Sequence, residues 1–315
     1  MPDWKGRSVL ITGGAGFLGS HLADMLLNKG ASISILDNFA IGSKRNLENS
    51  LEKMGLIDHD LSKGNLPLKK DFDCIFHLAA IASPHQCEKF PSDAFKVNVQ
   101  GTFEILKFAL KSSARKVIFT SSAFLYGNNP RYLPLDEKHP LDTTESVYSI
   151  TKKLGEDLCR TFKNEHSLPI TILRLFNTFG PRQTSDYLIP TIIEQAANKG
   201  KVQLWSDKPV RDFNFVSNTV DALIAVAESD DMGNNVYNVG SGEEISIKDI
   251  STVIASEFNA EVEFLDKPVV GPLRLRCDNS LMKEIFNWTP KVKFMDGLKQ
   301  TINWYKSHQK LPSIK

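Results

Sequence analysis

A glycine-spaced turn between an apolar strand and an amphipathic helix constrains the fold of this chain more than any other feature. The run T-G-G-A-G-F-L-G-S places glycines at 13, 16 and 19, between the strand pattern S-V-L-I-T and the helical run H-L-A-D-M-L-L-N-K. Glycine permits the tight turn, and the absent side chains let backbone N–H groups and the positive end of the helix approach a pyrophosphate. Because the required strand and helix flank the glycines, the turn predicts a dinucleotide-binding site rather than a simple loop.

The alternation of strand and helix continues through the first half of the chain. Apolar β-rich runs such as C-I-F-H-L-A and K-V-I-F-T-S-S alternate with helical stretches around 94–111 and after Tyr148. Parallel strands need crossover helices between them. The pattern therefore predicts an α/β fold built on a Rossmann-type doubly wound parallel sheet.

The alternation gives way after about Asn177 to loops rich in Pro, Gly and polar residues. A further strand, helix, strand pattern at 212–240 is expected to return to the first domain. We therefore predict a dinucleotide-binding domain over 1–176, joined by 212–240. A smaller, interleaved substrate domain is expected from 177–211 and 241–315.

Composition argues against several classes of partner. Lysine and arginine total 38 against 37 aspartates and glutamates in 315 residues, so no overall field attracts nucleic acid or an anionic membrane. The chain shows no targeting pattern at its N-terminus and no run of about 20 apolar residues. Its four cysteines form no C-x-x-C pair, which is typical of reduced, packed thiols. We expect a cytoplasmic protein with no bound metal and no contact with nucleic acid or membrane.

An acidic residue closes the second predicted strand. Asp37 stands 18 residues beyond the last glycine of the turn, where a carboxylate accepts hydrogen bonds from ribose hydroxyls and repels a 2′-phosphate. NAD is therefore favoured over NADP as the cofactor, although Lys44 and Arg45 lie nearby; the alternative is an aspartate that caps a loop. Asp60 and Leu61 are expected either to flank the adenine or to form a solvated turn.

Three polar side chains are expected to meet at the carboxyl edge of the predicted sheet. V-Y-S-I-T-K-K places Tyr148 and Lys152 on one face of a helix, and Ser122 ends a predicted strand at the same sheet edge. A free phenol has a pKa near 10, so a phenolate base at pH 7 costs roughly 4 kcal/mol. A protonated lysine one turn away, with a cationic nicotinamide, is expected to lower that cost. The alternative is an ordinary amphipathic helix.

Five motifs occur in order along the chain: G-x-x-G-x-x-G, H-L-A-A at 77–80, N-V-Q-G-T at 98–102, S-S-A-F-L-Y-G at 121–127 and Y-S-I-T-K at 148–152. Together they resemble the extended short-chain dehydrogenase/reductase family, whose glycine spacing differs from the G-x-G-x-x-G of ordinary Rossmann dehydrogenases. More narrowly, the chain looks like the NAD-dependent nucleotide-sugar epimerases and dehydratases of that family, and most like UDP-glucose 4-epimerases. R-L-F-N-T-F-G-P-R at 174–182, R-D-F at 211–213 and N-V-G-S-G at 238–242 extend the likeness over nearly the whole chain.

The resemblance implies a set of site residues. Ser122, Tyr148 and Lys152 are expected to be catalytic. The residues expected to contact NAD are Gly13, Gly16, Phe17, Leu18, Gly19, Asp37, Asn38, Ser43, Asp60, Leu61, Leu78, Ala79, Ala80, Asn98, Tyr148, Lys152 and Phe176. Those expected to contact a nucleotide-sugar substrate are Ser122, Tyr148, Asn177, Arg211 and Arg276. Arg276 or Arg274 is expected to replace a family arginine that this chain lacks. Asn98 has the alternative of satisfying buried backbone groups, and His77 is expected to anchor a strand.

The residues after the strand serine bear on the reaction. At that point the family's 4,6-dehydratases have an acid pair and its nucleotide-sugar decarboxylases a glutamate, whereas this chain has Ala123 and Phe124, which cannot transfer a proton. The resemblance therefore favours a nucleotide-sugar 4-epimerase that acts through a transient 4-keto sugar. A 4-dehydrogenase or a 4-ketosugar reductase is the close alternative, and a dehydratase is less favoured.

A function without catalysis remains an alternative at this point. An NAD(H)-binding sensor needs the glycine turn and Asp37 but can dispense with Tyr148 and Lys152, and both are present. The resemblance also implies a homodimer, formed through the helices around 94–111 and 147–163.

Overall fold

The computed structural model describes residues 4–112, 114–144, 146–229, 236–269 and 271–308. Its centre is a seven-stranded sheet with the order β11-β6-β5-β4-β1-β2-β3. Every neighbouring pair in this sheet is parallel. The strands are β1 (Ser8–Thr12), β2 (Ser32–Asp37), β3 (Gly55–Asp58), β4 (Cys74–His77), β5 (Lys116–Ser122), β6 (Ile170–Leu175) and β11 (Val236–Val239). The predicted Rossmann-type α/β fold is confirmed.

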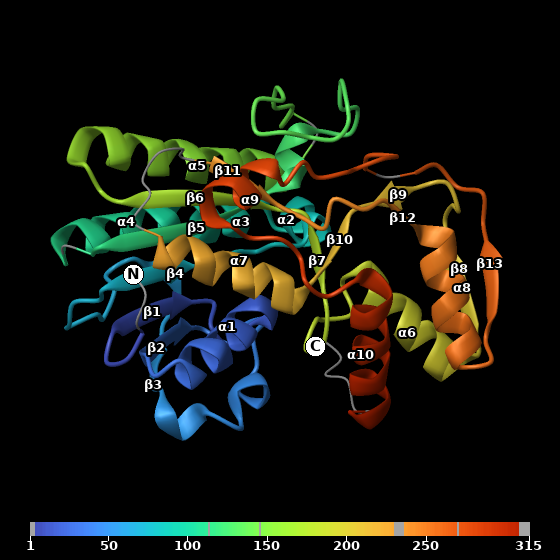
Figure 1. Cartoon of the computed structure of the whole chain (residues 1–315), viewed down its shortest axis with the longest axis horizontal. Helices are drawn as coiled ribbons and strands as arrows, with labels where there is room; N and C mark the ends of the chain where they lie inside the picture. The colour runs from blue at the N-terminus through green and yellow to red at the C-terminus, as the bar shows by residue number, and fades with distance from the viewer. Residues whose placement is uncertain (1–3, 113, 145, 230–235, 270, 309–315) are drawn as a thin grey trace.

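Helices cover both faces of this sheet (Figure 1). Helices α1 (Phe17–Asn28) and α7 (Val216–Glu228) pack together on one face, while α4 (Gly101–Lys111) and α5 (Val147–His166) pack together on the other. Strand β1 shows how the sequence produces this arrangement. Val9 and Ile11 belong to the core under α1 and α7, and Leu10 belongs to the core under α4 and α5. A strand whose three central positions are all apolar is therefore buried on both faces.

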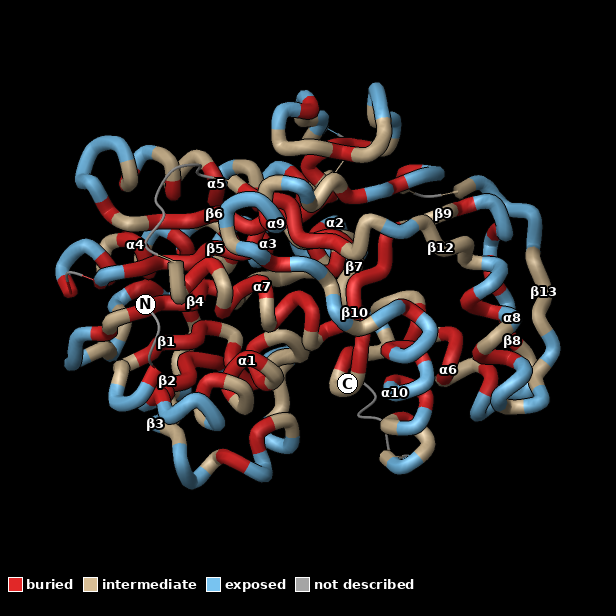
Figure 2. The backbone as a smooth tube through the Cα atoms, in the orientation of Figure 1, coloured by how far each residue is buried: buried red, intermediate tan, exposed pale blue. Residues whose placement is uncertain are grey.

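Burial follows the same layering. Figure 2 shows the strands of the large sheet, except the edge strand β3, buried along most of their length, whereas the outer helices alternate between buried and exposed segments. Two short helices, α2 (Pro84–Lys89) and α3 (Pro91–Phe95), and a π-helical turn, η4 (Lys96–Gln100), connect β4 to α4. Short 3₁₀ turns stand at Lys44–Leu47, Leu51–Lys53, Leu61–Lys63 and Ala123–Tyr126.

The chain beyond β6 builds three small two-stranded sheets beside the large one. These pair β7 (Asn177–Phe179) with β10 (Phe213–Phe215), β8 (Lys201–Leu204) with β13 (Glu261–Phe264), and β9 (Val210–Arg211) with β12 (Ile245–Ser246). Helices α6 (Leu188–Lys199), α8 (Ile247–Glu257), α9 (Ser280–Phe286) and α10 (Phe294–Ser307) complete this part (Figure 1).

Strand β11 returns to the large sheet and pairs with β6. It follows α7, which packs on α1 of the first half of the chain. Within the predicted return segment 212–240, positions 230–235 lie outside the described residues. The domain boundaries drawn from the sequence stay a prediction. In the described part of the chain, no helix is long and apolar enough to cross a membrane.

Candidate active site

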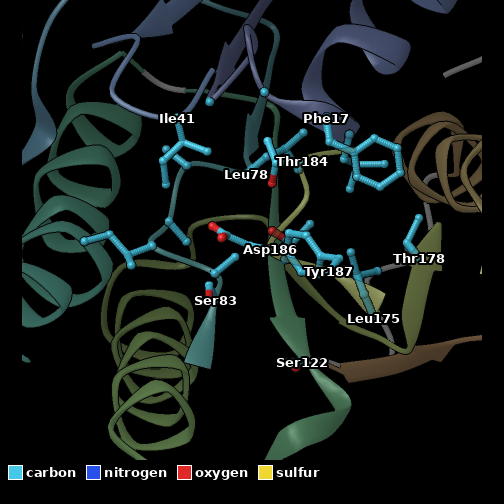
Figure 3. A pocket seen from close by; sticks show the side chains of 18 of the residues that line it. Phe17, Ile41, Leu78, Ser83, Ser122, Leu175, Thr178, Thr184, Asp186 and Tyr187 are labelled. Carbon is cyan, nitrogen blue, oxygen red and sulfur yellow. The ribbon is translucent and has the colours of Figure 1, made fainter. Parts of the chain in front are cut away.

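A cavity of about 860 Å³ opens along the carboxyl edge of the parallel sheet. Its walls come from the loops that follow β1, β2, β4, β5 and β6, together with segments of the second half of the chain. Figure 3 looks into this cavity, with Ser122 at the end of its strand and the loop bearing Thr184, Asp186 and Tyr187 across from it. Ligands of doubly wound sheets bind at this edge.

The glycine turn forms one end of the cavity. Gly13 has a φ of +69°, and a Cβ there would lie 2.8 Å from the Cα of Ala79. A Cβ on Gly19 would overlap the carbonyl oxygen of Gly13. Helix α1 begins after Gly16 with no side-chain cap, so its first N–H groups face the cavity without a side-chain partner. Only glycine fits this cradle, and the free N–H groups suit a pyrophosphate.

Asp37 ends β2 beside this cradle and is 8% exposed. Its Oδ2 accepts a hydrogen bond from the backbone N–H of Ala15 at 2.9 Å, and its Oδ1 accepts one from that of Phe39 at 2.8 Å. Burial raises the pKa of this carboxyl, and backbone hydrogen bonds oppose the shift. Each carboxylate oxygen has a second lone pair, so Asp37 retains the capacity to accept hydrogen bonds from ribose hydroxyls. The cradle and the acid together fit NAD.

The three predicted catalytic side chains all line the cavity. Helix α5 presents Tyr148 and Lys152 one turn apart, and Ser122 ends β5. All three are buried, with exposed fractions of 7%, 4% and 5% for Tyr148, Lys152 and Ser122. The Nζ of Lys152 donates a hydrogen bond to the carbonyl oxygen of Thr120 at 2.8 Å. The sheet edge and one face of α5 therefore bring the trio together.

Burial has the largest effect on the pKa of Tyr148 and on that of Lys152. It raises the pKa of Tyr148 to about 12, and a hydrogen bond with the Ser122 side chain acts in the opposite direction. It also lowers the pKa of Lys152 to about 8. A neighbouring lysine was expected to lower the pKa of the phenol, whereas burial in the protein without its cofactor raises it.

Asn98 does not line the cavity. Its Oδ1 accepts a hydrogen bond from the N–H of Ile81 at 2.8 Å, and its Nδ2 donates to the carbonyl of Ile81 and to Oγ1 of Thr151, at 3.1 and 3.0 Å. It lies in the π-helical turn η4, a type of irregularity that often marks functional sites. Asn98 thus joins the loop after β4 to helix α5, one residue before Lys152.

His77 anchors strand β4 inside the core and is 2% exposed. Its Nδ1 lies 2.7 Å from Oγ1 of Thr12, and its Nε2 lies 2.9 Å from Oγ1 of Thr102. Thr102 donates its own hydroxyl proton to the carbonyl of Asn98. It can therefore only accept from Nε2, which places the imidazole proton on that nitrogen. Burial lowers the pKa of His77 to about 3, so the ring is neutral.

Two of the predicted substrate residues reach the cavity from the second half of the chain. Arg211 lines it and donates to the carbonyl of Val210 at 3.1 Å, and no carboxylate among the described residues pairs with it. Burial lowers the pKa of Arg211 to about 10. Asn177 lines the cavity nearby and donates to the carbonyl of Asp212 at 3.0 Å. A guanidinium without a counter-ion is suited to an anionic ligand.

Two other predicted residues do not line the cavity. Ser43 caps the turn that starts at Lys44, by accepting from the N–H of Arg45. Arg276 is exposed and donates to the carbonyl of Gly242 at 3.1 Å, while its neighbour Leu275 is buried and lines the cavity. Side chains alternate along this extended stretch, so Arg276 points away from the cavity. Its alternative, Arg274, pairs with Glu244 at 2.7 Å.

The remaining predicted residues line the cavity. They are Phe17, Leu18, Asn38, Asp60, Leu61, Leu78, Ala79, Ala80 and Phe176. Sequence reasoning missed Arg182, Thr184, Asp186 and Tyr187, which line the cavity from the loop after β7. The motif G-P-R at 180–182 marks the start of this loop and was its one local signal.

A Rossmann-type sheet, a glycine cradle and a buried Ser-Tyr-Lys trio in one cavity define an extended short-chain dehydrogenase/reductase. Residues 9–240 match the NAD dependent epimerase/dehydratase family. The chain belongs to this family and is an enzyme of it, with NAD as the cofactor.

Known relatives carry several different activities in their names. UDP-glucuronic acid decarboxylase 1 of Arabidopsis thaliana is 31% identical, over 96% of this chain and 71% of the relative. A putative UDP-glucose 4-epimerase of Methanocaldococcus jannaschii is 28% identical, over 96% of this chain and 99% of the relative. The solved UDP-N-acetylglucosamine 4-epimerase of Methanobrevibacter ruminantium M1, in complex with UDP-N-acetylmuramic acid, is 31% identical with a TM-score of 0.90, over 96% of this chain and 99% of that chain.

Proposed function

We propose that this chain is a nucleotide-sugar 4-epimerase that acts through a transient 4-keto sugar. The observation that carries the proposal is a cavity in which Ser122, Tyr148 and Lys152 stand together without an acid at positions 123 and 124. Epimerisation at carbon 4 needs one group to take and return the hydroxyl proton, and a hydride acceptor. It needs no further acid, because the ketone is reduced on its other face after turning over.

The three side chains divide the work at the reacting alcohol. Tyr148 takes the proton of the C4 hydroxyl and returns it on reduction, while Ser122 orients that hydroxyl. Bound NAD would supply the acceptor for the C4 hydride and a positive charge that favours the phenolate. Lys152, held on the carbonyl of Thr120, adds a second positive charge and a donor for ribose hydroxyls. Because burial raises the pKa of Tyr148 to about 12, removal of its proton depends on the positive charges of Lys152 and of bound NAD.

The nucleotide end of the substrate is assigned to Arg211 and Asn177. Arg211 offers a guanidinium fork without a carboxylate partner in the described chain, and this geometry suits diphosphate oxygens. The relatives reported above carry UDP-sugars in their names, which supports a UDP-sugar as the substrate.

The decarboxylases among these relatives favour a second candidate, the removal of a sugar carboxylate. The positions that follow the strand serine weigh against it. Ala123 is 2% exposed and Phe124 packs edge-on against Tyr148, with ring centroids 5.9 Å apart. Neither side chain can hold or transfer a proton. A 4-dehydrogenase or a 4-ketosugar reductase would use the same trio and differ only in the fate of the hydride.

A homodimer and a cytoplasmic location complete the proposal. On α4 and α5, which pack side by side, Phe103, Ile150 and Leu154 have exposed fractions of 39%, 43% and 37%. Apolar side chains gathered on adjacent helices are typical of a protein interface. All four cysteines are free and buried, which is consistent with a reducing compartment.

The test is incubation of the NAD-loaded enzyme with UDP-, GDP-, dTDP- and CDP-hexoses, followed by NMR of the products. We expect the C4 epimer of one of them, with no net formation of NADH. Tyr148→Phe should lower turnover at least about 100-fold while NAD stays bound. Epimerisation that survives in this variant contradicts the role of Tyr148. Net NADH formation favours a dehydrogenase, and a pentose product from UDP-glucuronate favours a decarboxylase.

A further inference from the structure

The loop from Gly180 to Leu188 crosses the cavity and is anchored at several points. Arg182 pairs with Asp24 of α1 at 2.8 Å. Gln183 donates from its Nε2 to the carbonyl of Thr178 at 2.9 Å, and its own carbonyl accepts the hydroxyl of Tyr305 from α10. These contacts fix the first part of the loop against α1 and α10.

Two side chains of this loop lie beside the catalytic phenol. Tyr187 lines the cavity, and its hydroxyl has no hydrogen-bond partner among the described residues. Burial raises the pKa of Tyr187, and the charges of Tyr148 and Asp186 raise it further. Tyr148, Asp186 and Tyr187 all line the same cavity, at the end where the sugar must react.

Asp186 supplies the one carboxylate on this loop. Figure 3 shows its side chain in the cavity, close to Tyr187 and facing Ser83. It lines the cavity and has neither a hydrogen-bond nor an ion-pair partner in the part of the chain that the structure describes. An unpaired carboxylate is an acceptor for sugar hydroxyls and repels another carboxylate.

The lysine and arginine side chains that line the cavity are Lys152, Arg182 and Arg211. Lys152 donates a hydrogen bond to the carbonyl of Thr120 and lies one helical turn from Tyr148. Arg182 is paired with Asp24. Arg211 is assigned to the diphosphate. A carboxylate on the sugar ring would therefore meet Asp186 and find no free cation among these lining residues.

We propose that Asp186 and Tyr187 are specificity residues that select an uncharged hexose and reject a uronic acid at the sugar end of the cavity. The selection rests on the proposed nucleotide-sugar function and adds the class of sugar to it. Asp186 accepts hydrogen bonds from hydroxyls of the ring, and Tyr187 supplies a hydroxyl that can donate or accept. A sugar that carries a carboxylate at carbon 5 loses these contacts and faces a like charge.

Calorimetric binding of UDP-glucose and UDP-glucuronate to the NAD-loaded enzyme, at one low salt concentration, tests the proposal. We expect UDP-glucose to bind at least tenfold more tightly, a difference of about 1.4 kcal/mol. Asp186→Asn should lower this ratio several-fold, mainly by strengthening the binding of UDP-glucuronate. Tyr187→Phe should weaken the binding of UDP-glucose several-fold. Glu165→Gln, which removes one negative charge from the exposed far end of α5, should leave the ratio unchanged.

The ratio of the two affinities distinguishes selection from a general loss of structure, because misfolding weakens the binding of both ligands together. Equal binding of the two ligands to the unmodified enzyme overturns the proposal, as does an unchanged ratio in Asp186→Asn or the absence of binding by either ligand. Since binding is measured rather than turnover, an enzyme that selects UDP-glucose without epimerising it contradicts the proposed function and leaves the selectivity standing.

Discussion

The Nζ of Lys152 donates a hydrogen bond to the carbonyl oxygen of Thr120 at 2.8 Å, which ties helix α5 to the end of strand β5. Thr120 precedes Ser122 by two residues, so the ammonium is held at the same sheet edge as that hydroxyl. The lysine is buried, and burial lowers its pKa from 10.5 to about 8. The fold therefore keeps a charge in a site that solvates it less well than water does.

Replacing this lysine should stabilise the protein while abolishing its activity. A folded pKa of about 8 against 10.5 in the unfolded chain corresponds to about 3 kcal/mol of unfavourable free energy when the lysine is charged. This cost is fully present below pH 8 and disappears as the pH rises to 10.5, because the unfolded chain then loses its proton too. Lys152→Met should therefore be more stable than the unmodified enzyme at pH 7, by up to about 3 kcal/mol, and the gain should shrink between pH 8 and 10.5.

Urea unfolding of the two proteins without NAD, at several pH values, measures this gain. Lys153→Met, at a position that is partly exposed and paired with Asp157 at 2.6 Å, is the matched control and should show no such pH dependence. A Lys152→Met variant that is less stable at pH 7 contradicts the argument.

Asp37 should decide between NAD and NADP. Its oxygens face the glycine turn and the loop after β2, where ribose hydroxyls of the cofactor are expected. Asp37→Asn should weaken the binding of NADH. It should also lower the preference for NADH over NADPH about tenfold, because it removes the charge that repels a 2′-phosphate. Fluorescence titrations with each cofactor measure this preference, and pH 8 is chosen because burial raises the pKa of Asp37. Asp58 on β3 is the register partner of Asp37 on β2, and it does not line the cavity. Asp58→Asn should therefore change this preference much less.

Short sequence patterns were sufficient to predict those parts of the site that depend only on local backbone geometry. The glycine turn, Asp37 and the pair Tyr148 and Lys152 each depend on a strand end or on one helical turn, and these spacings are visible in the sequence. Arg276 was predicted to face the cavity and does not. Which side chains of an extended stretch point inward depends on contacts with residues that are distant in sequence. Burial reversed the expected shift of the Tyr148 pKa for a similar reason, since desolvation depends on the assembled core.

The loop that carries Asp186 escaped prediction for a reason of the same kind. Its position over the cavity depends on contacts with α1 and α10, which are far away in sequence. No periodicity or motif in the loop itself encodes those contacts, apart from G-P-R at its start.

Asn98 should matter for stability and for catalysis together. Its amide satisfies both backbone groups of Ile81 and reaches Thr151 on the catalytic helix. Asn98→Ala leaves the N–H of Ile81 without its partner, and we expect a loss of about 1 to 3 kcal/mol in the free energy of unfolding. Turnover should fall as well, because Thr151 adjoins Lys152 in α5. Asn164→Ala, at an exposed position of the same helix, should change neither quantity appreciably, and an Asn98→Ala loss below 1 kcal/mol would be too small for this role.

The exposed apolar face of α4 and α5 gives a prediction about assembly. Ile150 and Leu154 are one turn apart on α5 and are 43% and 37% exposed, and Phe103 of the adjacent α4 is 39% exposed. If two copies pair through this face, each buries the same patch in a two-fold interface. The double variant Ile150→Glu, Leu154→Glu places four carboxylates in that interface and should sediment as a monomer at concentrations where the unmodified enzyme is a dimer. Met295→Glu on α10, where the side chain is 54% exposed, should leave the dimer intact. An unmodified enzyme that sediments as a monomer at micromolar concentration, or a double variant that stays dimeric, excludes this face as the interface.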